Sequence, residues 1–205
     1  MGLNQIDTPV HWAIATWPWN NYHPDKIDVM LSQKPKINEA GRWKAKASYN
    51  YGQLLGSQHM AARRLGLDDA IFVDENGMIA EASTANIFYV KDGKVYTPSD
   101  DAAILLGITR DSMIKLLKYY HKIDVIKRDA PIEEIYDARE AWVSGSAVRA
   151  SRIRRVVDRE GVEHLIGNPD KDEIYPLAKS SLTQVQRGEC PEFSHWLSPV
   201  YKKLA

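Results

Sequence analysis

The chain has 205 residues, 44% hydrophobic and 26% charged, so it can bury a core as one large domain or as a domain plus part of another. Basic and acidic residues number 27 each, and this zero net charge argues against nucleic acid or an anionic membrane as the main partner. The single cysteine, Cys190, fits a reducing cytoplasm, and neither a membrane span nor a signal peptide is visible in the sequence.

The first predicted elements are an aromatic strand and a helix. Residues 10–22, VHWAIATWPWNNY, begin as an apolar strand-like run that ends at Pro18. Residues 34–46 are polar and basic. Residues 52–66 place apolar and small side chains on one face of a helix, and Gly66 provides a C-terminal stop.

Two hairpins follow. AIFVDENGMIAE predicts two strands joined by a type I′ turn at Asn76-Gly77, and NIFYVKDGKVYTP predicts a second pair that turns at Asp92-Gly93. Between them lies EASTA, Glu81 to Ala85, with one carboxylate followed only by small residues. This composition allows a ligand to approach the backbone closely.

The helix GITRDSMIKLLKYY comes next, with Thr109 as the predicted N-cap and Asp111 in the first turn. Gly107 stands just before it, where free N–H groups and the helix dipole favour a phosphate, although many helices begin after a glycine. IDVIKRD then predicts a strand, PIEEIYD a short helix, and REAWVSGSA a strand that ends in a small-residue turn.

The last third predicts a basic strand and a helix. RASRIRRVVDREG is interpreted as a strand with a solvated arginine face and with Ile153 and Val157 inward, and residues 172–186 as a helix. Hairpins mixed with helices predict an α+β fold with an antiparallel or mixed sheet. The histidines and the cysteine lack metal-site spacing, and the glycine-rich nucleotide motifs are absent from the sequence.

Four motifs occur in a meaningful order: AKASYNYG, DDAIFVDENGMIAEASTANIF, LLGITRD and WVSGSA. Together they resemble the larger domain of the fold-type-IV pyridoxal-phosphate enzymes, which comprise branched-chain aminotransferases, D-amino-acid aminotransferases and aminodeoxychorismate lyases. The setting of the lysine, the DDAIFVDENG hairpin and WPWNNY most resemble the branched-chain L-amino-acid aminotransferases. The resemblance covers nearly the whole chain and implies a pseudo-barrel of mixed or antiparallel strands with packed helices.

The resemblance implies roles for three chemical groups around pyridoxal 5′-phosphate. Lys46 resembles the lysine that forms the Schiff base with the cofactor aldehyde, and a plain surface lysine is the alternative that the other motifs make less plausible. Tyr51 resembles the tyrosine that hydrogen-bonds the phenolic oxygen. Glu81 resembles the carboxylate that pairs with the ring nitrogen and keeps the ring an electron sink.

Further residues are implied for the phosphate and the substrate. Gly107, the N–H groups of Ile108 and Thr109, and the hydroxyl of Ser146 resemble the phosphate cradle. Ser146 and Ala147 also resemble residues that hold the substrate carboxylate. Trp19 and Tyr22 resemble aromatic residues of the substrate pocket, with core packing as their alternative.

The implied reaction is transamination of branched-chain L-amino acids with 2-oxoglutarate in two half-reactions. A lysine must lose its proton before it can attack, and the amine it regains can then move a proton between the substrate Cα and the cofactor. The other family activities share Lys46 and Glu81, so D-amino-acid transamination and lyase-type elimination stay open. A non-catalytic domain that needs a partner chain is the alternative from a different class.

Members of this family carry an additional N-terminal domain. Residues 1–33 are therefore interpreted as its remnant and the connector, and residues 34–205 as the cofactor-binding domain. The chain is then a fragment, a natural split protein with a separate N-terminal chain, or a truncated form; the expected assembly is a homodimer or higher homo-oligomer. Arg149 and Arg152 are candidates to replace the phosphate-binding arginine of the absent domain, and Tyr49 is expected to narrow the pocket.

Overall fold

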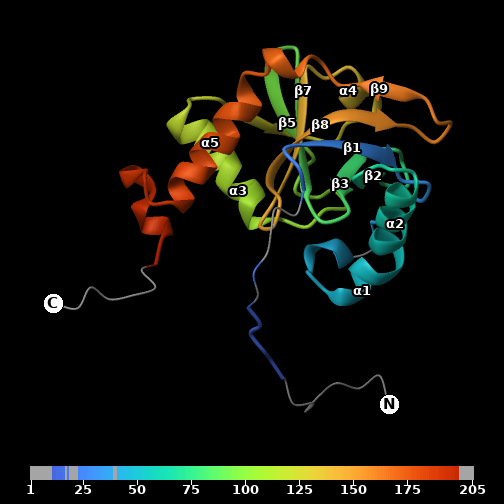
Figure 1. Cartoon of the computed structure of the whole chain (residues 1–205), viewed down its shortest axis with the longest axis horizontal. Helices are drawn as coiled ribbons and strands as arrows, with labels where there is room; N and C mark the ends of the chain where they lie inside the picture. The colour runs from blue at the N-terminus through green and yellow to red at the C-terminus, as the bar shows by residue number, and fades with distance from the viewer. Residues whose placement is uncertain (1–10, 17, 19–22, 39–40, 199–205) are drawn as a thin grey trace.

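The protein folds around one curled sheet with helices on its outer faces (Figure 1). The computed structural model describes residues 11–16, 18, 23–38 and 41–198. The strands are β1 (Lys26–Leu31), β2 (Asp69–Val73), β3 (Ile79–Ala82), β4 (Asn86–Lys91), β5 (Lys94–Thr97), β6 (Val125–Lys127), β7 (Glu140–Gly145), β8 (Arg149–Val157) and β9 (Glu163–Leu165).

The helices alternate with these strands and include two π-helical segments. The α-helices are α1 (Ser48–Asn50), α2 (Gly56–Arg64), α3 (Ile108–Lys115), α4 (Glu133–Tyr136) and α5 (Ile174–Gln186). The π-helical segments are η2 (Tyr51–Leu55) and η3 (Leu116–Tyr120), and the 3-10 turns are η1 (Arg42–Lys44), η4 (Pro169–Lys171) and η5 (Pro191–Trp196). Of the helices in the described part, none has both the length and the apolar character that a bilayer crossing requires.

The strand order is β3-β2-β1-β8-β7-β4-β5-β6, with β9 paired to β8. The pairs β1–β2, β1–β8 and β5–β6 are parallel and the others are antiparallel. The two ends of the sheet approach each other, because Ile79 N–H donates to Ala130 O at 2.8 Å and Met78 bridges Pro131 just after β6. The expected α+β pseudo-barrel with a mixed sheet is therefore confirmed.

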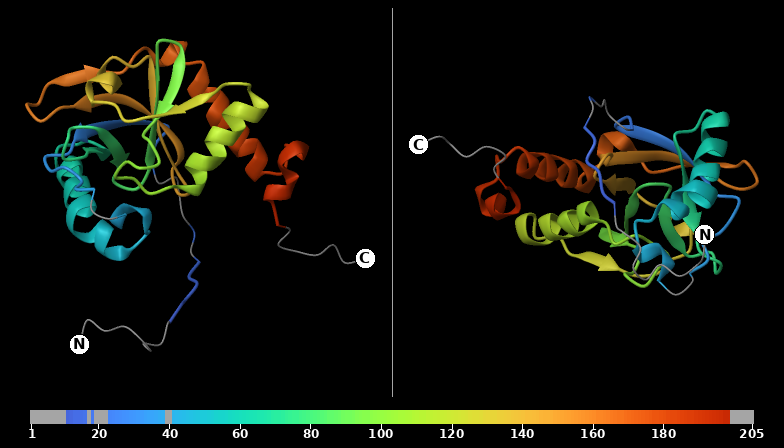
Figure 2. Two further views of the ribbon diagram at one scale, coloured as in Figure 1. Left: turned by 180° about the vertical axis from the view of Figure 1, so that it is seen from behind. Right: turned by 90° about the horizontal axis from the view of Figure 1, so that it is seen from below.

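Alternation along the strands divides the apolar residues between the inside and the outside of the curled sheet. On β2, Ile71 and Val73 enter the inner core, whereas Ala70 and Phe72 belong to a cluster on the outer face beside α2. A second outer cluster joins Trp142 of β7 to α3 and α5. Figures 1 and 2 show α3 and α5 together at one end of the sheet and α1 with α2 at the other.

Several element predictions need correction. Residues 11–16 are irregular and exposed, with Trp12 82% exposed, and they run away from the sheet instead of forming a strand (Figure 1). The β2–β3 hairpin exists, but its turn is not type I′, because Gly77 has a positive φ and Asn76 does not. The carboxylate of Asp74 accepts N–H groups from Asn76 and Met78 and sets a longer turn. Asp92 and Gly93 both have positive φ.

Strand β1 was not predicted, although it lies between β2 and β8 in the sheet. The sheet therefore begins at Lys26, while the domain division at residue 33 stays a prediction. The basic strand β8 was predicted, but its arginine face is only partly solvated. Arg152 is fully buried and forms an ion pair with Asp172, because a carboxylate from the segment before α5 reaches it inside the fold.

Candidate active site

A cavity of about 250 Å³ opens beside the ends of β3 and β7 and the start of α3. It brings together all the residues that the sequence assigns to the cofactor: Lys46, Tyr51, Glu81, Gly107, Ile108, Thr109 and Ser146. Ala147 is exposed and does not line this cavity. Trp19 and Tyr22 lie outside the described residues.

Lys46 lies in the short loop between η1 and α1, and its neighbours fix that loop. The side chain of Asn50 donates to the carbonyls of Arg42 (3.2 Å) and Ala45 (3.0 Å), which ties the loop to the first turn of α1. Trp43 is buried and donates its indole N–H to Ile37 O at 2.7 Å. The Lys46 side chain is thereby left at the exposed rim of the cavity.

Lys44 has a structural role. Its ammonium donates to the carbonyls of Ala102 (2.9 Å) and Asp100, and so ties the Lys46 loop to the segment before α3.

Glu81 forms the inner wall of the cavity and is almost completely buried on β3. Its Oε2 accepts hydrogen bonds from Asn86 Nδ2 (3.1 Å) and Leu105 N–H (3.0 Å). Its Oε1 lies 2.5 Å from Nζ of Lys36. Burial raises the pKa of Glu81, and the Lys36 ammonium opposes that rise. The carboxylate is therefore fixed by donors on several sides.

Tyr51 begins the π-helical segment η2 and reaches the same cavity. Burial raises the pKa of its phenol, and the negative charge of Glu81 adds to that rise. The hydroxyl consequently keeps its proton at neutral pH and can donate a hydrogen bond to an oxygen in the cavity.

The N-terminus of α3 supplies free backbone donors. Gly107 is the N-cap, in place of the predicted Thr109, and no side chain caps the helix. A Cβ at Gly107 would lie 2.3 Å from Asn86 Oδ1, so only glycine allows the chain to pass so close to Asn86. The N–H groups of Ile108 and Thr109 belong to the first turn and have no partner within the helix. They form an anion site at the cavity wall.

The end of β7 forms the opposite wall with the loop between β3 and β4. A Cβ at Gly145 would lie 3.3 Å from Thr84 O and 3.6 Å from Ala85 Cβ, so the two segments pack closely because they carry small residues. Ser144 is buried beside this contact, and its hydroxyl has no hydrogen-bond partner among the described residues. A buried hydroxyl in this state can accept a ligand.

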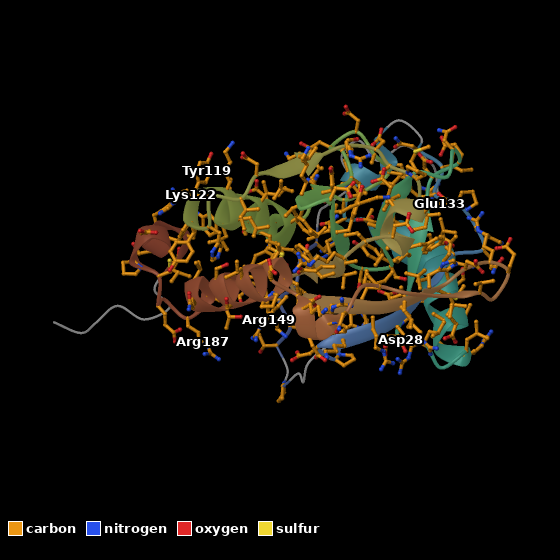
Figure 3. All side chains as sticks on the ribbon, turned by 90° about the horizontal axis from the view of Figure 1, so that it is seen from above. Asp28, Tyr119, Lys122, Glu133, Arg149 and Arg187 are labelled. Atoms are coloured by element: carbon orange, nitrogen blue, oxygen red, sulfur yellow. The ribbon has the colours of Figure 1, made fainter. Side chains whose placement is uncertain are left out.

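Neither candidate arginine reaches the cavity. The guanidinium of Arg152 is occupied by Asp172 and by the carbonyls of Ile153 and Ile166, at 2.6 and 2.9 Å. Arg149 is exposed, and Figure 3 shows it at the periphery of the molecule. Tyr49 is 55% exposed and does not line this cavity, so it does not narrow it.

Sequence reasoning missed several residues of the site. Leu105 and Ser144 line the cavity, but their types carry no signal for the roles their backbone and hydroxyl groups play. Asn86 belongs to a recognised motif, yet its hydrogen bond to Glu81 was not predicted. Lys36 gave no signal, because it stands in a polar segment among other lysines. Among the described residues, no group of three or more His, Cys, Asp or Glu side chains could hold a metal ion.

The fold and the site together define a class of protein. An amine, a phenol, a buried carboxylate and a free helix N-terminus surround one cavity on a curled mixed sheet, as in the fold-type-IV enzymes. A branched-chain aminotransferase from the archaeon Thermoproteus uzoniensis, solved with norvaline, has a similar structure: the TM-score is 0.82 at 25% identity, covering 91% of this chain and 60% of the other. The branched-chain amino acid aminotransferase of T.th., complexed with N-(5′-phosphopyridoxyl)-L-glutamate, gives 0.77 at 27% identity, covering 85% and 57%.

The model of the amino-transferase class IV family matches residues 2–156. The chain belongs to this family. The branched-chain-amino-acid aminotransferase of Escherichia coli K12 is 38% identical over 198 residues, which cover 91% of this chain and 60% of that relative. A probable branched-chain-amino-acid aminotransferase of Aquifex aeolicus is 33% identical over 162 residues, covering 79% and 50%. The chain thus spans about half to three fifths of the length of these relatives.

Proposed function

We propose that the chain catalyses pyridoxal-phosphate-dependent transamination of branched-chain L-amino acids with 2-oxoglutarate, with Lys46 as the cofactor-bearing lysine. The observation that carries this proposal is the convergence of Lys46, Tyr51 and Glu81 on one cavity that the uncapped end of α3 also reaches. Family membership and the branched-chain aminotransferases among the relatives and structural neighbours support it.

The residues present fit pyridoxal phosphate. Small residues leave room where a Cβ at Gly107 or Gly145 would intrude. The free N–H groups of Ile108 and Thr109, with the hydroxyl of Ser146 nearby, suit a phosphate dianion. The unpartnered hydroxyl of Ser144 offers a further hydrogen bond. The donor set therefore matches a phosphate at one end of the cavity and a ring with a basic nitrogen at Glu81.

Each side chain has a task that its chemistry can perform. Lys46 would bind the cofactor covalently and, as a free amine, move the proton at the substrate Cα. Glu81 would accept the N–H of the ring nitrogen, and Tyr51 would donate to the ring oxygen. When bound, the cofactor supplies the electron sink that makes removal of the Cα proton possible. Water access is limited on the inner side, where Glu81 is buried.

The substrate assignment rests on the comparisons and on residues at the cavity rim. Norvaline and a phosphopyridoxyl-glutamate adduct accompany the two structural neighbours, which supports an aliphatic amino acid as one substrate and glutamate with 2-oxoglutarate as the other pair. In this proposal Ser146 and Ala147 hold the substrate carboxylate, and Trp19 and Tyr22 line the side-chain pocket. Assays with L-leucine, D-alanine and aminodeoxychorismate separate this activity from D-amino-acid transamination and from elimination.

The proposal also includes association with a second protein surface. Ile108 lines the cavity and is 82% exposed, and Leu106 beside it is 49% exposed. Two large apolar side chains at the mouth of a polar cavity favour cover by a second copy of the chain or by a separate chain that carries an N-terminal domain. Sedimentation velocity with and without pyridoxal phosphate measures this association.

The decisive experiment is borohydride reduction of the protein incubated with pyridoxal phosphate, followed by peptide mapping. Reduction fixes a lysine–cofactor linkage as a stable amine, and we expect the label on the peptide that contains Lys46. The matched control is Lys44→Arg, which keeps a cation on the carbonyls of the neighbouring loop and should retain the label. Label spread over surface lysines, or absent, contradicts the proposal.

A further inference from the structure

Lys36 is a completely buried lysine at the back of the candidate active site. It follows β1, and its backbone is fixed by a bridge to Asp74 and by its N–H, which donates to Val73 O at 2.8 Å. The side chain therefore leaves a rigid part of the fold and has little freedom to choose its direction.

The Lys36 ammonium has two neighbours. Its Nζ lies 2.5 Å from Oε1 of Glu81 and 4.0 Å from the centroid of the Trp43 ring. A buried ammonium is costly unless a carboxylate compensates it, and the same holds for the carboxylate. Burial lowers the pKa of Lys36 and raises that of Glu81, so each group depends on the other to stay charged.

The hydrogen bonds to Glu81 leave space for one more donor. Its two oxygens offer about four acceptor positions. Lys36 occupies one of them, and Asn86 and Leu105 N–H occupy two. About one position remains, and Glu81 lines the cavity. The arrangement can thus accept a single hydrogen bond from a ligand that enters the cavity.

Other charged or titratable groups act on Glu81 more weakly. Lys44 lies on the same side but bonds to backbone carbonyls, and Tyr51 is a neutral phenol. Among the described residues, Lys36 is the cation within ion-pair distance of Glu81.

We propose that Lys36 is a positioning residue, whose buried ammonium keeps Glu81 ionised and fixed at the inner wall so that it can accept the N–H of the cofactor ring nitrogen. The part that concerns the cofactor rests on the proposed function. The part that concerns Glu81 holds for the ligand-free protein and can be tested in it.

The substitution Lys36→Met removes the charge and keeps an unbranched apolar side chain of similar length. Buried without its cation, Glu81 then favours its protonated form, so its pKa rises further in the folded state. A protonated carboxyl turns one acceptor position into a donor, and it can no longer receive the ring N–H as an anion. Lys34→Met is the matched control, because Lys34 lies two positions away and is exposed.

The first measurement is thermal denaturation as a function of pH. A carboxyl whose pKa is raised in the folded state stabilises the protein below the pKa of the unfolded chain, near 4, and this stability is lost as the pH rises through the folded value. The melting temperature of Lys36→Met should therefore fall between about pH 4 and pH 8 relative to the double variant Lys36→Met/Glu81→Gln, which has no charge to bury. Lys34→Met should follow the wild type at every pH.

The second measurement is infrared difference spectroscopy of the ligand-free protein, with Glu81→Gln to assign the bands. We expect a carboxylate band from Glu81 at pH 7 in the wild type and a protonated carboxyl band in Lys36→Met. An ionised Glu81 in Lys36→Met, or a melting difference that does not depend on pH, overturns the proposal. A Lys36→Met variant that folds only at acid pH supports it, because acid supplies the missing proton.

The third measurement is the affinity for pyridoxal phosphate, followed by its absorbance. Loss of one charge-assisted hydrogen bond predicts binding weaker by about tenfold in Lys36→Met. If the wild type binds and Lys36→Met binds equally well, the inference fails and the proposed function stands. If the wild type does not bind while the two ligand-free measurements agree with expectation, the proposed function fails and the control of Glu81 by Lys36 stands.

Discussion

The glycine before helix α3 has no room for a side chain. A Cβ at Gly107 would lie 2.3 Å from Oδ1 of Asn86. The Asn86 side chain cannot simply move away, because its Nδ2 donates to Glu81 at 3.1 Å and to Leu105 O at 2.7 Å. One glycine therefore connects the phosphate end of the site to the carboxylate end, through a single amide.

Gly107→Ala should displace the Asn86 amide and lower the free energy of unfolding by about 1–3 kcal/mol, the range for buried polar groups that lose a partner. Urea denaturation measures this loss, and pyridoxal phosphate binding should weaken with it. The control is Gly52→Ala, because a Cβ there meets nothing within 4 Å and the position is helical. That variant should be neutral or more stable by about 0.5–1 kcal/mol. Equal stabilities for the two variants would contradict this account.

At this scale the sequence predicted the types of the chemical groups better than their partners. Lys46, Tyr51 and Glu81 reach one cavity as expected. The N-cap is Gly107 rather than Thr109, because the close approach of Asn86 decides the backbone there. Lys36 could not be predicted, since only the tertiary fold brings it to Glu81, and no local pattern separates it from an exposed lysine.

Helix α5 is fixed at its N-terminus by a carboxylate from another element. Glu140, fully buried at the start of β7, accepts the N–H groups of Glu173 (2.8 Å), Ile174 (3.1 Å) and Tyr175 (2.7 Å). These are free donors of the first turn, and a negative charge there also suits the helix dipole. The contact orients α5 over the outer cluster that contains Trp142.

Glu140→Ala should leave these donors buried and unpaired and lower the free energy of unfolding by about 1–3 kcal/mol. Glu140→Gln keeps one carbonyl acceptor, so its loss should be smaller. Denaturation followed by circular dichroism gives both values. Glu160→Ala is the control, because Glu160 is exposed, and it should stay within about 0.5 kcal/mol of the wild type. A Glu140→Ala variant as stable as this control would show that α5 does not need the cap.

Local patterns predicted most elements, because turn residues and helical periodicity act over a few positions. The hairpins β2–β3 and β4–β5 are examples. The prediction failed where tertiary partners decide. The aromatic run that includes residues 11–16 has the composition of a strand but finds no place in the sheet, whereas β1 follows a polar loop and becomes a strand between β2 and β8.

At the scale of the whole molecule, the curled sheet brings the cofactor-site residues together. The contact between β3 and the segment after β6 depends on pairs far apart in sequence, such as Ile79 with Ala130. Resemblance to a family predicted this pseudo-barrel; spacing and periodicity do not encode it. The cavity follows from the same curling, because β3, β7 and the start of α3 meet only when the sheet closes.

Global stability in acid should depend on Asp69, which lies fully buried on β2 and joins that strand to α2. Its carboxylate contacts His59 Nδ1 at 3.0 Å, His23 Nε2 at 3.5 Å and Ala70 N–H at 2.8 Å. Burial alone would raise the pKa of Asp69, but hydrogen bonds from these groups outweigh it and lower the pKa from 3.8 to about 2.

A carboxyl whose pKa is lowered in the folded state stabilises the protein above the pKa of the unfolded chain, and this stability is lost as the pH falls through the folded value. Asp69→Asn should therefore lower the free energy of unfolding by about 2 kcal/mol at pH 7, and its difference from the wild type should shrink between about pH 4 and pH 2. Urea denaturation across this range measures it. The exposed Asp111→Asn, which breaks a surface pair with Lys115, should change stability by less than about 1 kcal/mol at any pH. A constant difference between Asp69→Asn and the wild type down to pH 2 would mean that packing around Asp69, and not its charge, joins β2 to α2.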